Sequence, residues 1–242
     1  IPTGTDPNKI TTGVVVDLDG TARHVPTKIV VIDGKYYAQI NSLTNSTYAV
    51  VWHPLAFRDM ANHWAKDAVN DMGSRMVISG AGDDSFNPDA DITRAEFAAI
   101  LVRGLGLAPE QGATGFSDVS ASAWYNDSVH TAYAYGLIKG FKDGTFRPNA
   151  KITREEAMVM IAKAMEITEL RAKGESKGSE EQLAAYKDNE SVSEWAKSSI
   201  ADCLHAGVVS GRGNSELAPK ANITRAEAAV MIKQLLQKSE LI

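Results

Sequence analysis

Three arginines occupy the same local sequence and could bind an anion. The first stands between Thr93 and Glu96, and two later segments repeat this pattern. The threonine and the glutamate form a capping box, which predicts that a helix begins at each segment. The helix dipole disfavours a cation in the first turn, so helix stability alone does not explain an arginine there. Because a guanidinium beside free helix-terminal amides binds carboxylate or phosphate well, the recurrence favours an anion site over ordinary surface ion pairs. The arginines are Arg94, Arg154 and Arg225.

Each arginine belongs to a longer repeat that begins near a tryptophan. The tryptophan lies 32 residues before the capping-box glutamate in all three copies, and a glycine follows the tryptophan by 16 residues. An aspartate stands a few residues before each tryptophan. An indole with an exposed edge could stack on a sugar ring, whereas a buried indole would only anchor a helix, and the spacing leaves both open. The repeated residues are Asp59, Trp64 and Gly80, then Asp118, Trp124 and Gly140, then Asp188, Trp195 and Gly211.

Each copy is predicted to fold as helix, loop, helix. The first helix starts near the tryptophan, with Trp64, Val69 and Met72 on one apolar face. Cys203 takes the place of Met72 in copy three, which favours a buried small hydrophobe over a reactive thiol. The loop of copy two contains an Asp-Gly-Thr-Phe segment from Asp143, which is typical of a turn. The loops of copies one and three lack this segment, and we expect them to be looser.

These motifs together resemble the S-layer homology (SLH) domain family, in three copies over residues 57–238. The resemblance implies a mainly α fold of three helix-loop-helix repeats in a pseudo-threefold bundle with grooves between repeats. It implies that the grooves bind secondary cell-wall polysaccharide with a pyruvate ketal on a terminal N-acetylmannosamine. Such binding would hold the protein outside a Gram-positive cell, at the cell wall or S-layer. The arginines would be the main ligand residues, joined by the aspartates, tryptophans and glycines of the repeat.

Composition excludes several other classes of protein. The chain has 242 residues, a net charge of −5 and a single cysteine. The longest apolar runs, such as residues 97–102, are far too short to cross a membrane. The acidic balance argues against a nucleic-acid partner, and one cysteine permits neither an intrachain disulfide nor a cysteine-based zinc site. We therefore expect no membrane insertion and no metal site. No cofactor or catalytic residue is expected either, and the resemblance implies a monomer whose three repeats form a pseudo-trimer. The first residues carry no signal-like segment, which suggests a removed signal or a fragment of a longer protein.

The N-terminal part of the chain differs in kind from the repeats. Residues 14–16, 28–32, 35–40 and 47–52 are rich in valine, isoleucine and tyrosine, and Asp33-Gly34 is typical of a hairpin turn. We predict an antiparallel unit of three or four strands, the end of a preceding β domain. The expected divisions are a β unit at 1–52, repeats at 53–110, 111–170 and 186–242, and an exposed, mobile linker at 171–185.

One segment of the β unit also matches an enzyme motif. Residues 14–21 resemble the first motif of haloacid-dehalogenase-type phosphatases, with Asp17 as nucleophile and Asp19 as acid/base. That fold requires alternating strands and helices after the motif, whereas hairpin signals follow here. A turn after a strand is therefore the preferred interpretation. A helical scaffold for protein partners is the remaining alternative to a carbohydrate-binding anchor.

Overall fold

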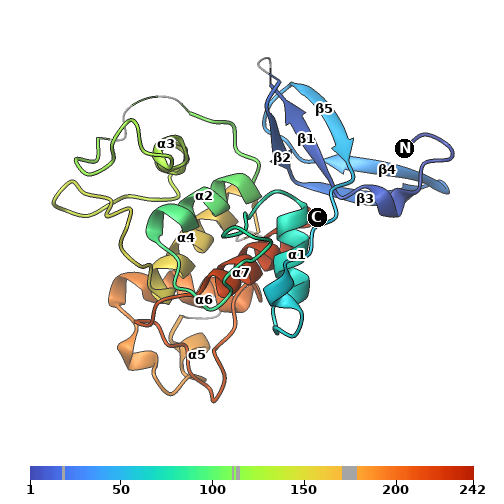
Figure 1. Ribbon diagram of the computed structural model, residues 1–242. Coiled ribbons are helices and arrows are strands. Elements are labelled where there is room, and N and C mark those ends of the chain that lie inside the picture. Colours follow the sequence, from blue (N-terminus) through green and yellow to red (C-terminus); the bar gives the residue numbers. More distant parts are fainter. Residues whose placement is uncertain (18–19, 111, 113–114, 171–178) are drawn as a thin grey trace.

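The computed structural model describes the chain except residues 18–19, 111, 113–114 and 171–178. A small group of strands lies to one side of a helical body (Figure 1). The described residues form seven α-helices, and helix is more abundant than strand. The helices are α1 (Lys66–Ser74), α2 (Arg94–Gly104), α3 (Asn126–Ala134), α4 (Arg154–Ile167), α5 (Ser179–Leu183), α6 (Lys197–His205) and α7 (Arg225–Lys238).

Each repeat forms the predicted pair of helices: α1 and α2, α3 and α4, α6 and α7. The second helix of every pair starts at its arginine, and the preceding threonine and the third-position glutamate make a complete capping box in all three. These second helices are the most buried of the described helices, and they occupy the middle of the body in Figure 1. The prediction from the Thr-x-x-Glu spacing is confirmed.

The predicted apolar face of the first helix was partly wrong. Val69 and Met72 are fully buried, and so is Cys203 at the matching position of α6. Trp64, however, precedes α1 and is 68% exposed, and the other two repeat tryptophans are exposed to a similar degree. A residue ahead of the first helical turn does not share the helix periodicity, so its side chain is free to turn toward solvent.

A closed ring of backbone hydrogen bonds joins the three repeats. The amide of Ile152 donates to the carbonyl of Ile92 (3.2 Å), Ile223 donates to Ile152 (3.1 Å), and Ile92 donates to Ile223 (3.1 Å). All three isoleucines are fully buried and stand two residues before a second helix. The ring therefore fixes the starts of α2, α4 and α7 beside one another.

The helices also pack across repeats. The second helix of each repeat contacts the first helix of another, in the pairs α2 with α3, α4 with α6, and α7 with α1. The side chains between these helices form one continuous hydrophobic core that draws on all three repeats. Because each repeat buries its apolar face against its neighbours, the body is expected to fold as one cooperative unit.

The described residues of the β unit form five strands, one more than the three or four expected. They are β1 (Thr12–Val16), β2 (Ala22–Val25), β3 (Thr27–Ile32), β4 (Lys35–Ile40) and β5 (Thr47–Val51). Strands β2, β1 and β5 form one antiparallel sheet, and β3 and β4 form a hairpin. Strand β2 was missed because Arg23 and His24 interrupt its apolar pattern. The predicted turn at Asp33-Gly34 is confirmed, since both residues have positive φ (49° and 72°).

The phosphatase motif lies in the β1–β2 hairpin. Every strand pairing in the described residues is antiparallel, which does not match a doubly wound parallel sheet. Asp17 begins the turn, where its amide donates to the carbonyl of Thr21 (2.9 Å), and its carboxylate lies 3.6 Å from Arg23. Asp19 lies outside the described residues. Within the predicted linker, residues 171–178 also lie outside the described part, and α5 occupies most of the remainder.

The β unit packs against the first repeat. The guanidinium of Arg23 donates to the carbonyl of Gly106 (3.3 Å), and Arg75 in turn donates to the carbonyl of Thr27 (3.2 Å). A Cβ atom on Gly106 would lie 2.7 Å from Cδ of Pro26, so the β2–β3 connection approaches the backbone after α2 closely.

His24 lies at this contact and is expected to make the stability of the protein depend on pH. Its side chain is buried against Thr12, and burial, helped by Arg75, lowers its pKa from 6.5 to about 3. Between these values only the unfolded chain binds the proton, so the contribution of His24 is present above pH 6.5 and is lost as the pH falls toward 3. We expect the free energy of unfolding to drop by about 2 kcal/mol between pH 6.5 and 5.

Urea denaturation of the wild type and of His24→Gln across this range measures the effect. The variant cannot take up the proton, so its stability should change less with pH than that of the wild type. Parallel pH profiles for the two proteins would contradict the assignment.

Candidate functional site

The three repeat arginines each reach into another repeat. In every case Nε donates to a loop carbonyl and Nη1 contacts the capping-box glutamate of that other repeat. The contacts are Arg94 with Phe146 O (2.9 Å) and Glu156 (2.8 Å), Arg154 with Leu217 O (2.8 Å) and Glu227 (3.1 Å), and Arg225 with Phe86 O (2.8 Å) and Glu96 (3.5 Å). Each arginine therefore binds a loop of another repeat.

These contacts bear on whether the arginines form ion pairs within the protein or bind an external anion. Arg94 and Arg154 are buried, and each pairs with a carboxylate, although the partner is distant in sequence. Burial lowers the pKa of Arg154, and the charge of Glu227 partly offsets this effect. Much of each guanidinium is thus used to join repeats, and its role toward a ligand stays a prediction.

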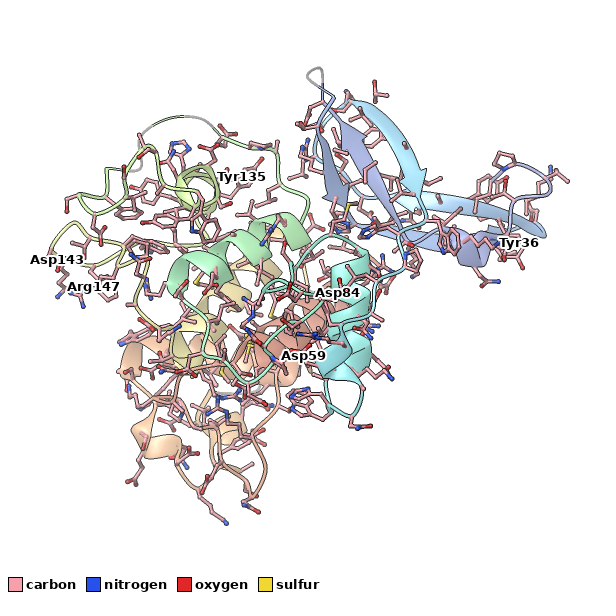
Figure 2. All side chains as sticks on the ribbon, viewed as in Figure 1. Tyr36, Asp59, Asp84, Tyr135, Asp143 and Arg147 are labelled. Atoms are coloured by element: carbon pink, nitrogen blue, oxygen red, sulfur yellow. The ribbon has the colours of Figure 1, made fainter. Side chains whose placement is uncertain are left out.

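The three repeat aspartates position the loops. Each accepts two consecutive loop amides, for example those of Phe86 and Asn87 at the Asp59 carboxylate (2.7–3.0 Å). Burial raises the pKa of Asp59, but these amide bonds outweigh burial and hold the pKa below its ordinary value. Figure 2 places Asp59 among the side chains of the helical body. The matching bonds are Asp118 with Phe146 and Arg147, and Asp188 with Leu217 and Ala218.

The repeat glycines leave room for an aromatic ring that the sequence analysis missed. A Cβ atom on Gly80 would lie 2.9 Å from the ring of Phe57, and a Cβ on Gly211 would lie 2.9 Å from the ring of Tyr186. At Gly140 the ring is that of Phe116. Each ring stands two residues before a repeat aspartate, so this constant offset was a usable signal.

One cavity brings several of the predicted residues together. It has a volume of about 610 Å³, and Trp64, Arg154 and Gly211 all line it, although they come from three different repeats. Apolar side chains of α7 form one wall, and Glu227 and Arg212 lie near Arg154. Trp64 does not share this cavity with Arg94, the arginine of its own repeat. A cavity of this size, with an exposed indole and guanidinium groups, can hold a small ligand of the size of a sugar.

Comparison with known families identifies the repeats. The sequence model of the S-layer homology domain matches residues 56–98, 115–158 and 185–229, which together form more than half of the chain. The chain belongs to the SLH domain family. SLH domains are non-catalytic modules that bind cell-wall polymers, and the proteins that carry them are S-layer or cell-surface proteins attached to the cell wall.

Several curated proteins are similar to this SLH chain. The amylopullulanase of Thermoanaerobacterium thermosulfurigenes is 37% identical over 86% of this chain and 11% of its own length. The exoglucanase XynX of Acetivibrio thermocellus is 36% identical over 81% of this chain and 18% of its own length. The surface-layer 125 kDa protein of Lysinibacillus sphaericus is 34% identical over 72% of this chain and 14% of its own length. The chain thus spans less than a fifth of each of these relatives.

Over the residues that the structure describes, no helix combines the length and apolar character needed to cross a membrane. The same residues contain no cluster of three or more histidine, cysteine, aspartate or glutamate side chains that could hold a metal ion.

The loops of the first and third SLH repeats are not looser than the second. Each forms a tight turn with two consecutive residues at positive φ, namely Asp83 and Asp84 in the first repeat and Asn214 and Ser215 in the third. Backbone bonds of 2.7–2.9 Å close both turns. Figure 2 shows Asp84 close to the helical body. The expectation was wrong because small polar residues can adopt positive φ without the Asp-Gly pair.

The loop of the second repeat uses side chains instead. Asp143 accepts from the amide (3.0 Å) and the hydroxyl (2.6 Å) of Thr145, and it pairs with Arg147 at 2.9 Å. These hydrogen bonds lower the pKa of Asp143 to about 2. Asp143 and Arg147 lie together at the outer edge of the molecule in Figure 2, so the pair braces the loop itself.

Proposed function

We propose that this chain anchors its protein to the cell wall by binding an acidic wall polysaccharide in grooves between SLH repeats. The ligand in this proposal is secondary cell-wall polysaccharide with a terminal pyruvate-ketal N-acetylmannosamine. The observation that carries the proposal is the cavity where Trp64, Arg154 and Gly211 meet. The indole supplies an apolar face for a sugar ring, and the arginines supply positive charge for the ketal carboxylate.

The proposal extends to the arrangement of the repeats. We take the body to be a pseudo-threefold bundle, so that a single chain acts as a pseudo-trimer and remains a monomer. The ring of Ile92, Ile152 and Ile223 supports this, because every repeat gives and receives the same bond. If the repeats are equivalent, Trp124 and Trp195 belong to two further grooves that contain Arg225 and Arg94. In this arrangement the module contributes binding and no catalysis.

Removal of the ketal should weaken binding strongly. Charge-assisted hydrogen bonds to arginine contribute about 1.5–3 kcal/mol, so loss of one carboxylate is expected to lower affinity roughly tenfold or more. Sedimentation of the protein with purified sacculi, before and after acid removal of pyruvate, measures this change. Mock-treated sacculi serve as the control. Equal binding to both preparations would show that the carboxylate is not recognised.

A further inference from the structure

The residue that follows each loop glycine differs among the three repeats, and in the second and third repeats it lies near one of the repeat arginines. It is Ala81 in the first repeat, Phe141 in the second and Arg212 in the third. The ring of Phe141 stacks on the guanidinium of Arg94, with 4.7 Å between Cζ and the ring centroid. Arg212 instead binds the carboxylate of Glu227 with two bonds of 2.7 and 2.6 Å. The same loop position therefore adds a methyl group, a ring or a cation to its groove.

Arg212 is the more accessible of the two arginines in the 610 Å³ cavity. The side chain of Arg154 is only 3% exposed, and its three guanidinium nitrogens donate to Leu217 O, Glu227 and Ser210 O. The side chain of Arg212 is 31% exposed, and within the described residues its Nη1 donates to no protein acceptor. Arg212 thus presents one available donor nitrogen, Nη1, because its Nε and Nη2 already bind protein acceptors, whereas Arg154 is committed to the protein.

The charges that line the cavity also favour an acidic ligand. Two guanidinium groups, those of Arg154 and Arg212, share the single carboxylate of Glu227, so the lining carries a net charge of +1. The inter-repeat arginines Arg94 and Arg225 each have a glutamate of their own. The lining thus holds one more cation than carboxylates, and beside the apolar side chains of Val209 and Met231 this charge attracts an anion more strongly than it would in open water.

We infer that Arg212 is the residue that contacts the acidic group of the ligand in this groove, and that it makes the Trp64 groove the tightest of the three for an acidic sugar. The carboxylate would accept from Nη1 of Arg212, with the sugar ring toward Trp64. Arg154 then acts as a positioning residue, because it holds the loop and Glu227 in place. This inference rests on the proposed function.

Calorimetric titration with two small probes tests the inference. The acidic probe is the methyl glycoside of pyruvate-ketal N-acetylmannosamine, and the neutral probe is the same glycoside without the ketal. Arg212→Ala should weaken binding of the acidic probe at least tenfold and leave binding of the neutral probe unchanged. Arg212→Lys should retain part of the affinity because it keeps the charge without the planar fork. Arg23→Ala is the control, since it removes an arginine of the β unit that pairs with Asp17, outside the grooves between repeats, and should change neither affinity.

The outcomes separate the inference from the proposed function. If the wild type binds both probes equally, the proposed function fails. If the wild type prefers the acidic probe but Arg212→Ala keeps that preference, the inference is overturned and the function stands. If Arg212→Ala weakens both probes alike, Arg212 only supports the loop, which also overturns the inference.

Discussion

Arg154→Ala is expected to destabilise the folded protein by about 3 kcal/mol. The substitution leaves the buried carbonyl of Leu217 without its donor, which costs about 1–3 kcal/mol. It also removes the bond to the carbonyl of Ser210, a residue that solvent reaches. Glu227 keeps its bonds to Arg212, which limits the loss. The capping box of α4 remains, so the helix still starts at the same place, but the side-chain bonds of Arg154 to the third repeat are lost.

Guanidinium chloride denaturation followed by circular dichroism measures this loss. Arg147→Ala is the control, because it breaks an ion pair whose two side chains are about half exposed. Exposed pairs contribute about 0–1 kcal/mol. Equal stability of the two variants would show that the inter-repeat contacts of Arg154 contribute little. The comparison also decides whether an Arg154 variant can be used in binding experiments at all.

Gly140→Ala should destabilise the protein about as much as Arg154→Ala, but through steric crowding and backbone strain. The new Cβ would clash with the ring of Phe116 and lie 2.8 Å from the carbonyl of Thr145, and the residue has a φ of +70°. Overpacking costs about 1–3 kcal/mol, and the left-handed conformation adds about 1 kcal/mol for a residue with a Cβ. We therefore expect a loss of about 3 kcal/mol in the free energy of unfolding.

Gly144→Ala isolates the conformational part of this loss. Gly144 has a φ of +77°, but no atom lies within 4 Å of a Cβ placed there. Its substitution should cost about 1 kcal/mol, the left-handed strain alone. If both variants lose the same amount of stability in chemical denaturation, close approach of Phe116 is not the reason for glycine at position 140.

Features set by local sequence were predictable, and features set by contacts between repeats were not. The three capping boxes follow from a threonine and a glutamate three residues apart, and all three formed. The repeat spacing also placed the loop glycines correctly between the helices. The partners of Arg94 and Arg154 could not be found this way, because they lie 52 to 73 residues away in sequence. No local pattern specifies which loop a given arginine reaches.

For the cavity too, single residues could be predicted from the sequence, but their position in one site could not. The sequence identified Trp64, Arg154 and Gly211 as candidate residues one by one, and the structure placed them in one cavity. Arg212 was missed because it occurs in one repeat only, and the repeat pattern contains only the residues that all three copies share. The repeat pattern starts at the tryptophan, and the aromatic rings ahead of it were missed because their offset from the tryptophan varies. Their offset from the repeat aspartate is constant; the rings are those of Phe57, Phe116 and Tyr186.

The closed ring of repeats has a mechanical consequence for an anchor under load. A pulling force that enters through the β unit reaches the first repeat, whose contacts with the third repeat close the ring: Ile92 with Ile223, and Glu96 with Arg225. Asn41 of the β unit also donates to the carbonyl of Leu241, near the C-terminal end of the body (3.4 Å). Tension is therefore shared between the first and last repeats from the outset, and no repeat can peel away as the free end of an open stack would.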